Sequence, residues 1–85
     1  MIRTNNENVI KNYLRFIDSK SHNENLYTRR NYNGEWELVN YSTKLVRIID
    51  NTLYYNTKKY SVTTSKIQTY IKREIANTDY DIVEM

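Results

Sequence analysis

Apolar residues near the start of the chain recur at helical spacing. Between about Asn6 and Lys20 they stand at relative positions i, i+1, i+4, i+5 and i+8, which are Val9, Ile10, Tyr13, Leu14 and Ile17. This stripe predicts an amphipathic helix with Asn6 as its N-cap and Glu7 in the first turn, where a carboxylate complements the helix dipole. Residues 19–25 are polar and rich in turn formers, so we expect a loop there.

The middle of the chain alternates apolar and polar residues, which is the pattern of strands. Asn33 and Gly34 stand between two β-prone runs, 26–32 and 35–41, and this pair predicts a hairpin with a two-residue type I′ turn. Turn formers near residues 42–43 and 50–51 predict two further strands. We expect a four-stranded antiparallel meander over residues 25–62, with a core side made of Trp36, Leu38, Val46, Ile48, Leu53 and Tyr55.

A second helical stripe follows the strands. Ser65 and Gln68 form the S-x-x-Q pattern of a capping box, so this helix is expected to begin at Lys66 and to end near Asn77. Its apolar stripe consists of Ile67, Tyr70, Ile71 and Ile75. The remaining residues 79–84 fit either an edge strand or a loose tail.

Together these elements predict one α+β domain over residues 1–85: an N-terminal helix, a four-stranded antiparallel β-meander and a second helix packed on one sheet face. The expected parts are a helix and loop (1–24), the meander (25–62), the capped helix (63–77) and an acidic tail (78–85). A chain of this length has room for one core only. Because such a core is thin, we expect a binding partner, and a homo-oligomer stays open.

Composition excludes several classes of protein. The chain has no cysteine, one histidine and one glycine, which leaves no basis for disulfides, Cys-based zinc sites, multi-histidine metal sites or Gly-rich phosphate loops. It also lacks the common motifs of metalloproteases, serine hydrolases and EF-hands. No membrane span or signal peptide is recognisable. We therefore expect a cytoplasmic protein that is not an enzyme and uses no cofactor.

Positive charge is concentrated in the predicted sheet and second helix. The net charge is +3, but residues 25–75 carry nine basic and four acidic side chains, and the last ten residues carry three acidic ones. Clustered cations interleaved with aromatic rings are typical of surfaces that bind nucleic acid. The expected partner-binding residues are Arg29, Arg30, Tyr32, Arg47, Tyr54, Lys58, Lys59, Tyr60, Lys66, Lys72 and Arg73.

The same segments also suit other roles. Tyrosines fill cross-strand pairs, and lysines keep sheet edges from aggregating. The start of the second helix resembles a helix-turn-helix recognition helix, although the residues before it are strand-like rather than helical. Glu35 and Glu37 also suit the paired carboxylates of a small hydrolase, and a solvated hairpin edge accounts for them more simply.

Two phrases in the chain, V-N-Y-x-T at residues 39–43 and K-Y-S-x-T-T-S-K-x-Q at residues 59–68, resemble a group of small uncharacterised proteins of bacteriophages and other mobile elements. The resemblance covers about residues 34–75. It implies a non-enzymatic, anti-CRISPR-like protein that inhibits a host nuclease defence complex by stoichiometric binding, with a defence protein or ribonucleoprotein complex as partner. The alternative is a small basic nucleic-acid-binding protein that uses the Arg/Lys/Tyr face of its sheet.

Overall fold

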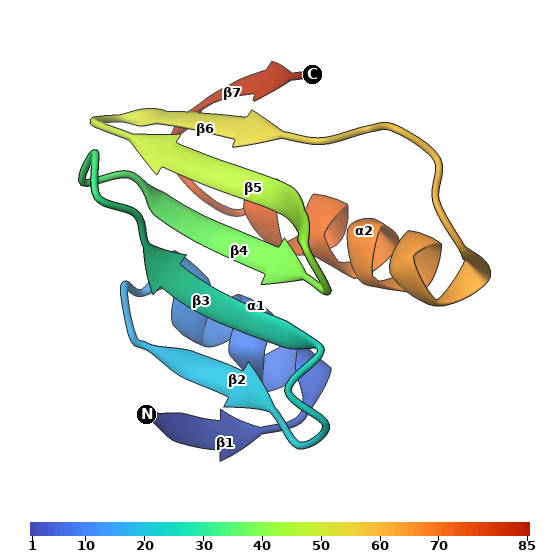
Figure 1. The fold of residues 1–85 in the computed structure, drawn as a ribbon. Coiled ribbons are helices and arrows are strands. Elements are labelled where there is room, and N and C mark those ends of the chain that lie inside the picture. The colour runs from blue at the N-terminus through green and yellow to red at the C-terminus, as the bar shows by residue number, and fades with distance from the viewer.

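Seven strands form one mixed sheet in the computed structural model, which describes residues 1–85, and two helices cover one face of that sheet (Figure 1). The strands are β1 (Ile2–Thr4), β2 (Ser19–Ser21), β3 (Leu26–Arg30), β4 (Trp36–Asn40), β5 (Thr43–Ile49), β6 (Thr52–Tyr55) and β7 (Asp81–Glu84), and the helices are α1 (Asn6–Leu14) and α2 (Val62–Ile75). Neighbouring strands follow chain order from β1 at one edge to β7 at the other. Neither helix has the length and apolar character that a membrane crossing requires.

The predicted α+β class agrees with this architecture, but the predicted four-stranded meander is wrong. Strands β2 to β6 are antiparallel, whereas β1 is parallel to β2 and β7 is parallel to β6. Each parallel pair is joined by a helix, so α1 and α2 are crossover connections. The strands β1, β2 and β7 have three or four residues each, and their sequences do not alternate apolar and polar residues regularly. They form where the helices return the chain to the sheet.

Both helices begin at a cap other than the predicted one. Asn5 caps α1 in place of Asn6. In α2 the cap is Ser61, whose side-chain oxygen accepts a hydrogen bond from the N–H of Thr64 at 3.3 Å. The predicted cap, Ser65, lies inside the helix one turn later. Ser61 and Ser65 are four residues apart, and Ser61 is the one that still has the extended backbone conformation of an N-cap.

Gln68 does not close a capping box. Its side-chain nitrogen donates to the carbonyls of Asn56 at 2.8 Å and Lys58 at 2.9 Å, which ties α2 to the connector of residues 56–61. This connector follows β6, so no helix lies directly upstream of α2 and the helix-turn-helix interpretation is wrong. The helix ends with Ala76 as its C-cap rather than at Asn77.

Helix α1 ends well before Lys20. The N–H of Phe16 donates to the carbonyl of Tyr13 and the N–H of Ile17 donates to the carbonyl of Asn12, which is the Schellman pattern of a helix C-terminus. Phe16 has the left-handed conformation that this closure needs, with φ of 59°. Residues 19–21 can then form β2, where the sequence predicts a loop.

The predicted hairpin is confirmed, but its predicted turn is wrong. Strands β3 and β4 pair along their full lengths. Gly34 has φ of 82°, whereas Asn33 has no positive φ and the turn is therefore not type I′. The N–H of Gly34 donates to the carbonyl of Asn31, and the N–H of Asn31 donates to the carbonyl of Glu35. Five residues, 31–35, separate the two strands, and the Asn31 side chain stabilises this loop by accepting hydrogen bonds from the N–H groups of Asn33 and Glu35.

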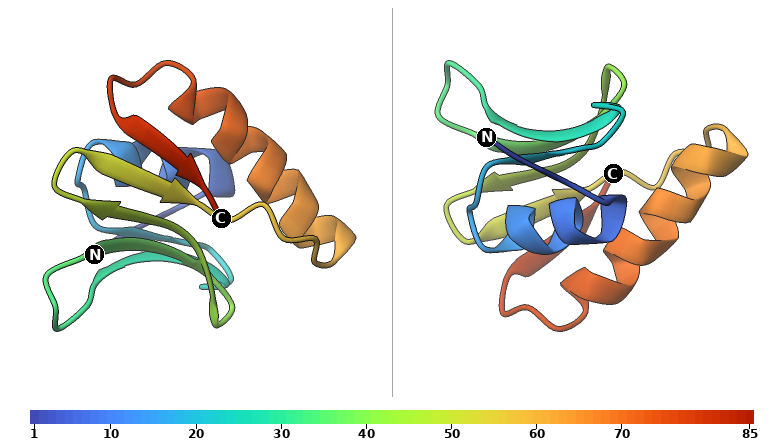
Figure 2. Two further views of the ribbon diagram at one scale, coloured as in Figure 1. Left: turned by 90° about the horizontal axis from the view of Figure 1, so that it is seen from above. Right: turned by 90° about the horizontal axis from the view of Figure 1, so that it is seen from below.

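The core lies between the sheet and the two helices, which Figure 2 shows on the same side of it. The predicted core residues in its buried cluster are Val9, Ile10, Tyr13, Trp36, Leu38, Val46, Ile48, Leu53, Tyr55, Ile67, Ile71 and Ile75. Leu14 and Tyr70 pack at its margin, and Ile17 is exposed. Tyr13 and Trp36 link helix to sheet, because each side chain donates a hydrogen bond of 2.7 Å to the other residue's carbonyl. The opposite face of the sheet, which we call the open face, carries no helix.

Candidate functional site

A β-bulge between β4 and β5 reshapes the open face. Leu38 pairs with Val46, but the next residue, Val39, pairs with Lys44, so Leu45 is an extra residue on β5. Leu45 and Val46 are consecutive, yet both are buried in the core cluster. A bulge of this kind interrupts the alternation of side chains between the two faces.

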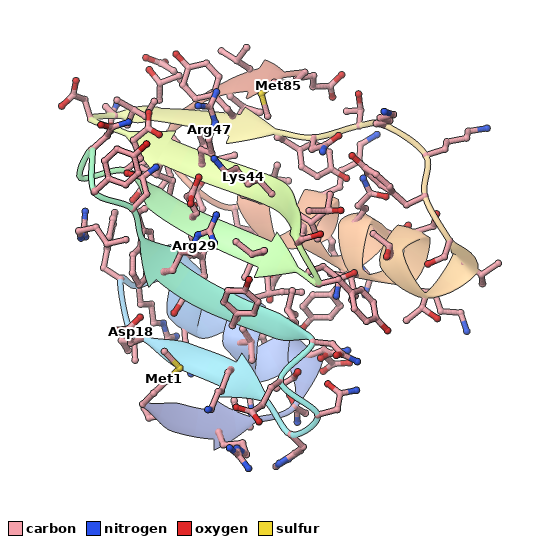
Figure 3. All side chains as sticks on the ribbon, viewed as in Figure 1. Met1, Asp18, Arg29, Lys44, Arg47 and Met85 are labelled. Atoms are coloured by element: carbon pink, nitrogen blue, oxygen red, sulfur yellow. The ribbon has the colours of Figure 1, made fainter.

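The bulge decides which cations share the open face. In a regular strand Lys44 and Arg47 are three residues apart and point to opposite faces. Here Lys44 and Arg47 lie on the open face together with Arg29 of β3, as Figure 3 shows. Strict alternation would place Lys44 on the core side with Val46, and the residues expected from sequence do not include it. No residue of this segment marks a bulge in advance, so only the pairing register shows it.

Glu37 lies beneath these cations and is fully buried. The guanidinium Nε of Arg29 donates to its Oε1 at 2.8 Å. The ammonium of Lys44 is an ion-pair partner 3.1 Å from Oε2, although Oε2 accepts no hydrogen bond of good geometry. Burial raises the pKa of Glu37, but the hydrogen bond from Arg29 and the charge of Lys44 outweigh burial and hold this pKa below its ordinary value. The same hydrogen bond raises the pKa of Arg29.

A polar hollow of about 620 Å³ lies beside the cations. The guanidinium of Arg47 lies 3.8 Å from a carboxylate oxygen of Glu35 and 5.2 Å from the centre of the Tyr54 ring. The residues that line the hollow are Arg29, Arg30, Asn31, Tyr32, Asn33, Glu35, Lys44 and Arg47. Four cations against one lining carboxylate leave the hollow positively charged, even with Glu37 buried beneath it.

The two glutamates are arranged for ion pairing rather than for acid–base chemistry. A general acid requires a raised pKa, whereas the pKa of Glu37 is lowered. Glu35 lies outside β4 and faces Arg47, and Glu37 faces Arg29 and Lys44. The geometry therefore gives no support to a hydrolase centred on this pair and instead suits an anionic ligand.

The structure brings together five of the residues expected to bind a partner. Arg29, Arg47 and Tyr54 lie on the open face, where Arg47 is opposite Tyr54 on the neighbouring strand. Arg30 and Tyr32 border the hollow at the β3–β4 loop, and Tyr32 is 99% exposed. This part of the expected set forms one continuous surface.

The other six expected residues lie away from the hollow. Three belong to the connector that follows β6, at the end of the sheet away from the β3–β4 loop, and three belong to α2, which lies behind the sheet (Figure 1). The six residues are Lys58, Lys59, Tyr60, Lys66, Lys72 and Arg73. They do not form one surface with Arg29 and Arg47.

No protein-family model, curated protein or solved structure matches this chain. We therefore infer its function from the side chains of the open face.

Proposed function

We propose that this chain is a non-enzymatic binding protein whose open face holds the phosphates of single-stranded nucleic acid. The observation that carries the proposal is the alignment of Arg29, Lys44 and Arg47 on one face by the β4–β5 bulge. Cations in a shared groove neutralise phosphates and release the counterions condensed on the strand, which favours binding at low salt. A hollow of about 620 Å³ beside them offers room for such a backbone.

The cations keep free donors for a ligand. The side chains of Arg29 and Lys44 are 43% and 48% exposed although both contact Glu37. A guanidinium has five N–H donors and an ammonium has three, so one bond to Glu37 leaves several for phosphate oxygens. Glu37 thus holds the two cations over the centre of the sheet without using up their capacity.

Aromatic rings favour a single strand over a duplex. Tyr27 of β3 and Tyr54 of β6 lie on the open face, opposite Val39 and Arg47. Tyr32 is almost fully exposed at the rim of the hollow. Unpaired bases stack on such rings, whereas a duplex keeps its bases within its own stack.

The resemblance to phage proteins implies a source for this ligand. A CRISPR effector of a bacterial host carries a guide RNA and displaces a DNA strand, so it presents nucleic acid at its surface channels. We propose that the protein works in the host cytoplasm and inhibits such a complex stoichiometrically, by binding this nucleic acid through its open face.

The test measures binding of a fluorescent oligo(dT) strand of about 15 nucleotides across a salt series. Affinity is expected to fall as salt rises, and Arg47→Gln is expected to weaken binding and to reduce the slope of log affinity against log salt by about 1. Lys11→Gln is the matched control. It also removes one positive charge and one long ion pair, Lys11 to Glu74 at 4.0 Å, but from α1 on the covered side.

Absence of binding at low salt, or equal losses in the two variants, would overturn the proposal. If the chain captures a host nuclease complex but binds no oligonucleotide, the open face is assigned to a protein partner instead. Ribonuclease and deoxyribonuclease treatment of the captured complex separates these outcomes, because binding through nucleic acid is lost on digestion.

A further inference from the structure

A second hollow, of about 360 Å³, lies where the end of α1 meets the β3–β4 loop and the β5–β6 turn. The Phe16 ring stacks on Trp36 with centroids 6.0 Å apart, and the guanidinium of Arg30 lies 5.2 Å from the centre of a Trp36 ring. Arg30, Asn33 and Glu35 line this hollow and also the polar hollow of the open face. The two hollows therefore adjoin around the β3–β4 loop, with Arg30 at their junction.

Phe16 is an unusual residue for its position. It stands just after the C-cap of α1 with φ of 59°, where glycine or asparagine is usual because a larger side chain crowds the backbone. Gly34 and Asp50, which also line this hollow and also have positive φ, tolerate that conformation better. Phe16 is also 48% exposed, so burial compensates only partly for its backbone conformation.

Trp36 and Arg30 hold this region in place. Trp36 is 4% exposed and is fixed by its hydrogen bond to the Tyr13 carbonyl, so it supports the Phe16 ring without reaching solvent itself. Arg30 donates to the carbonyl of Gly34 at 2.8 Å, which leaves other guanidinium donors free at the junction of the hollows. A half-exposed ring supported by a buried tryptophan, in the same hollow as a guanidinium with unused donors, is suited to bind a base next to its phosphate.

We infer that Phe16 is a stacking platform for one nucleobase of the strand whose phosphates lie on the open face. The inference rests on the proposed function and extends the binding track from the open face, past Arg30, to the end of α1. Stacking on a phenylalanine ring accepts every base, so this platform adds affinity without sequence selectivity.

The test compares oligo(dT) of about 15 nucleotides with an abasic strand of the same length, which has the phosphates but no bases. Phe16→Leu keeps an apolar side chain and loses the aromatic face. It is expected to weaken oligo(dT) binding about tenfold and to leave abasic-strand binding unchanged. Phe16→Tyr keeps the ring and is expected to bind oligo(dT) as the wild type does, whereas Arg47→Gln weakens both strands.

Two further measurements separate stacking from a structural role. Phe16→Gly removes the side chain but relieves the backbone at φ of 59°, so it is expected to keep its melting temperature while losing oligo(dT) affinity. Trp36 is the only tryptophan of the chain, and its emission is expected to change with oligo(dT) and not with the abasic strand.

Wild-type affinity for oligo(dT) in Phe16→Leu, or an equal loss on both strands, overturns the stacking role while the proposed function stands. Failure of the wild type to bind either strand overturns the proposed function itself. If Phe16→Gly unfolds, the pair Phe16→Leu and Phe16→Tyr decides the question, since both keep a large side chain over Trp36.

Discussion

The two faces of the sheet bury their residues by different means. On the covered face, helices α1 and α2 close a cluster of fourteen buried side chains, within which the Tyr55 hydroxyl donates a hydrogen bond of 2.7 Å to the Gln68 carbonyl. On the open face, Glu37 is just as buried, but the groups above it are the long, half-exposed side chains of Arg29 and Lys44.

This difference means that side chains on the covered face are hard to expose to solvent, whereas Glu37 on the open face is easier to expose. Uncovering a core residue requires a helix to move and breaks many contacts at once. Uncovering Glu37 requires only that two half-exposed side chains move away, which breaks two ion pairs but returns up to about 2 kcal/mol of rotamer freedom to each side chain. We therefore expect substitutions on the covered face to lower stability and substitutions on the open face to change binding.

The largest expected effect compares two neighbours on β4 that are both fully buried. Leu38→Ala removes part of the packed core and is expected to lower the free energy of unfolding by about 3 kcal/mol. Val39→Ala lies on the open face, where side chains can settle into the space, and is expected to cost about 1 kcal/mol. Urea unfolding of both variants checks the comparison, and equal losses would contradict it.

Glu37→Gln is expected to change stability and binding in opposite directions. It leaves Arg29 and Lys44 without their buried partner, but both remain half exposed to water, so the expected loss of unfolding free energy is about 1–2 kcal/mol. Because the open face gains one net positive charge, affinity for oligo(dT) is expected to rise. A variant that loses both stability and affinity would show that holding the two cations in place matters more for ligand binding than the added positive charge.

Glu37 is also expected to make the stability of the fold depend on pH. Its pKa in the folded protein is below the ordinary value of 4.5, so ionised Glu37 stabilises the fold at pH values above about 4.5. This contribution is lost as pH falls through the lowered pKa. The stability difference between wild type and Glu37→Gln is therefore expected to shrink below pH 4.5 and to stay constant between about pH 6 and 8. Thermal unfolding across this range measures it.

Removal of a tyrosine hydroxyl gives a smaller contrast. Burial raises the pKa of Tyr13, so its hydroxyl stays protonated and donates to the Trp36 carbonyl at 2.7 Å. Tyr13→Phe is expected to cost about 1 kcal/mol. The Tyr54 hydroxyl makes no hydrogen bond within the protein, and the Tyr54 ring contacts the Arg47 guanidinium. Tyr54→Phe keeps this ring and is therefore expected to leave the melting temperature unchanged. A similar loss in both variants would remove the distinction between the faces for polar groups.

Arg47→Gln is expected to have only a small effect on stability. Its ion pair with Glu35 spans 3.8 Å at a partly exposed position, and such pairs contribute about 0.5 kcal/mol or less. The control Lys11→Gln is expected to behave the same way in urea unfolding. A loss above about 2 kcal/mol for Arg47→Gln would make this residue structural and would weaken its use as a probe of binding.

Periodicity predicts the parts of this fold whose signal is local. The stripe that contains Val9 and Ile10, the stripe that contains Ile67 and Ile71, and the β3–β4 hairpin around Gly34 all follow from residue spacing and backbone preference. The residues at which helices begin and end are harder to predict. Several serines and asparagines can act as caps, and the helix ends depend on which of them the neighbouring chain reaches.

The sequence by itself determined which residues are apolar enough for the core and which segments are helices or central strands, because 3.6- and 2-residue periods are properties of the chain alone. Only the tertiary structure decided that β1 and β2 form, and that residues 81–84 are the edge strand β7 rather than a loose tail, because a helix returns the chain to the sheet in each case. It also decided the candidate site. One extra residue, Leu45, turns Lys44 toward Arg29 and Arg47, and a bulge arises from the pairing of two strands rather than from either strand alone.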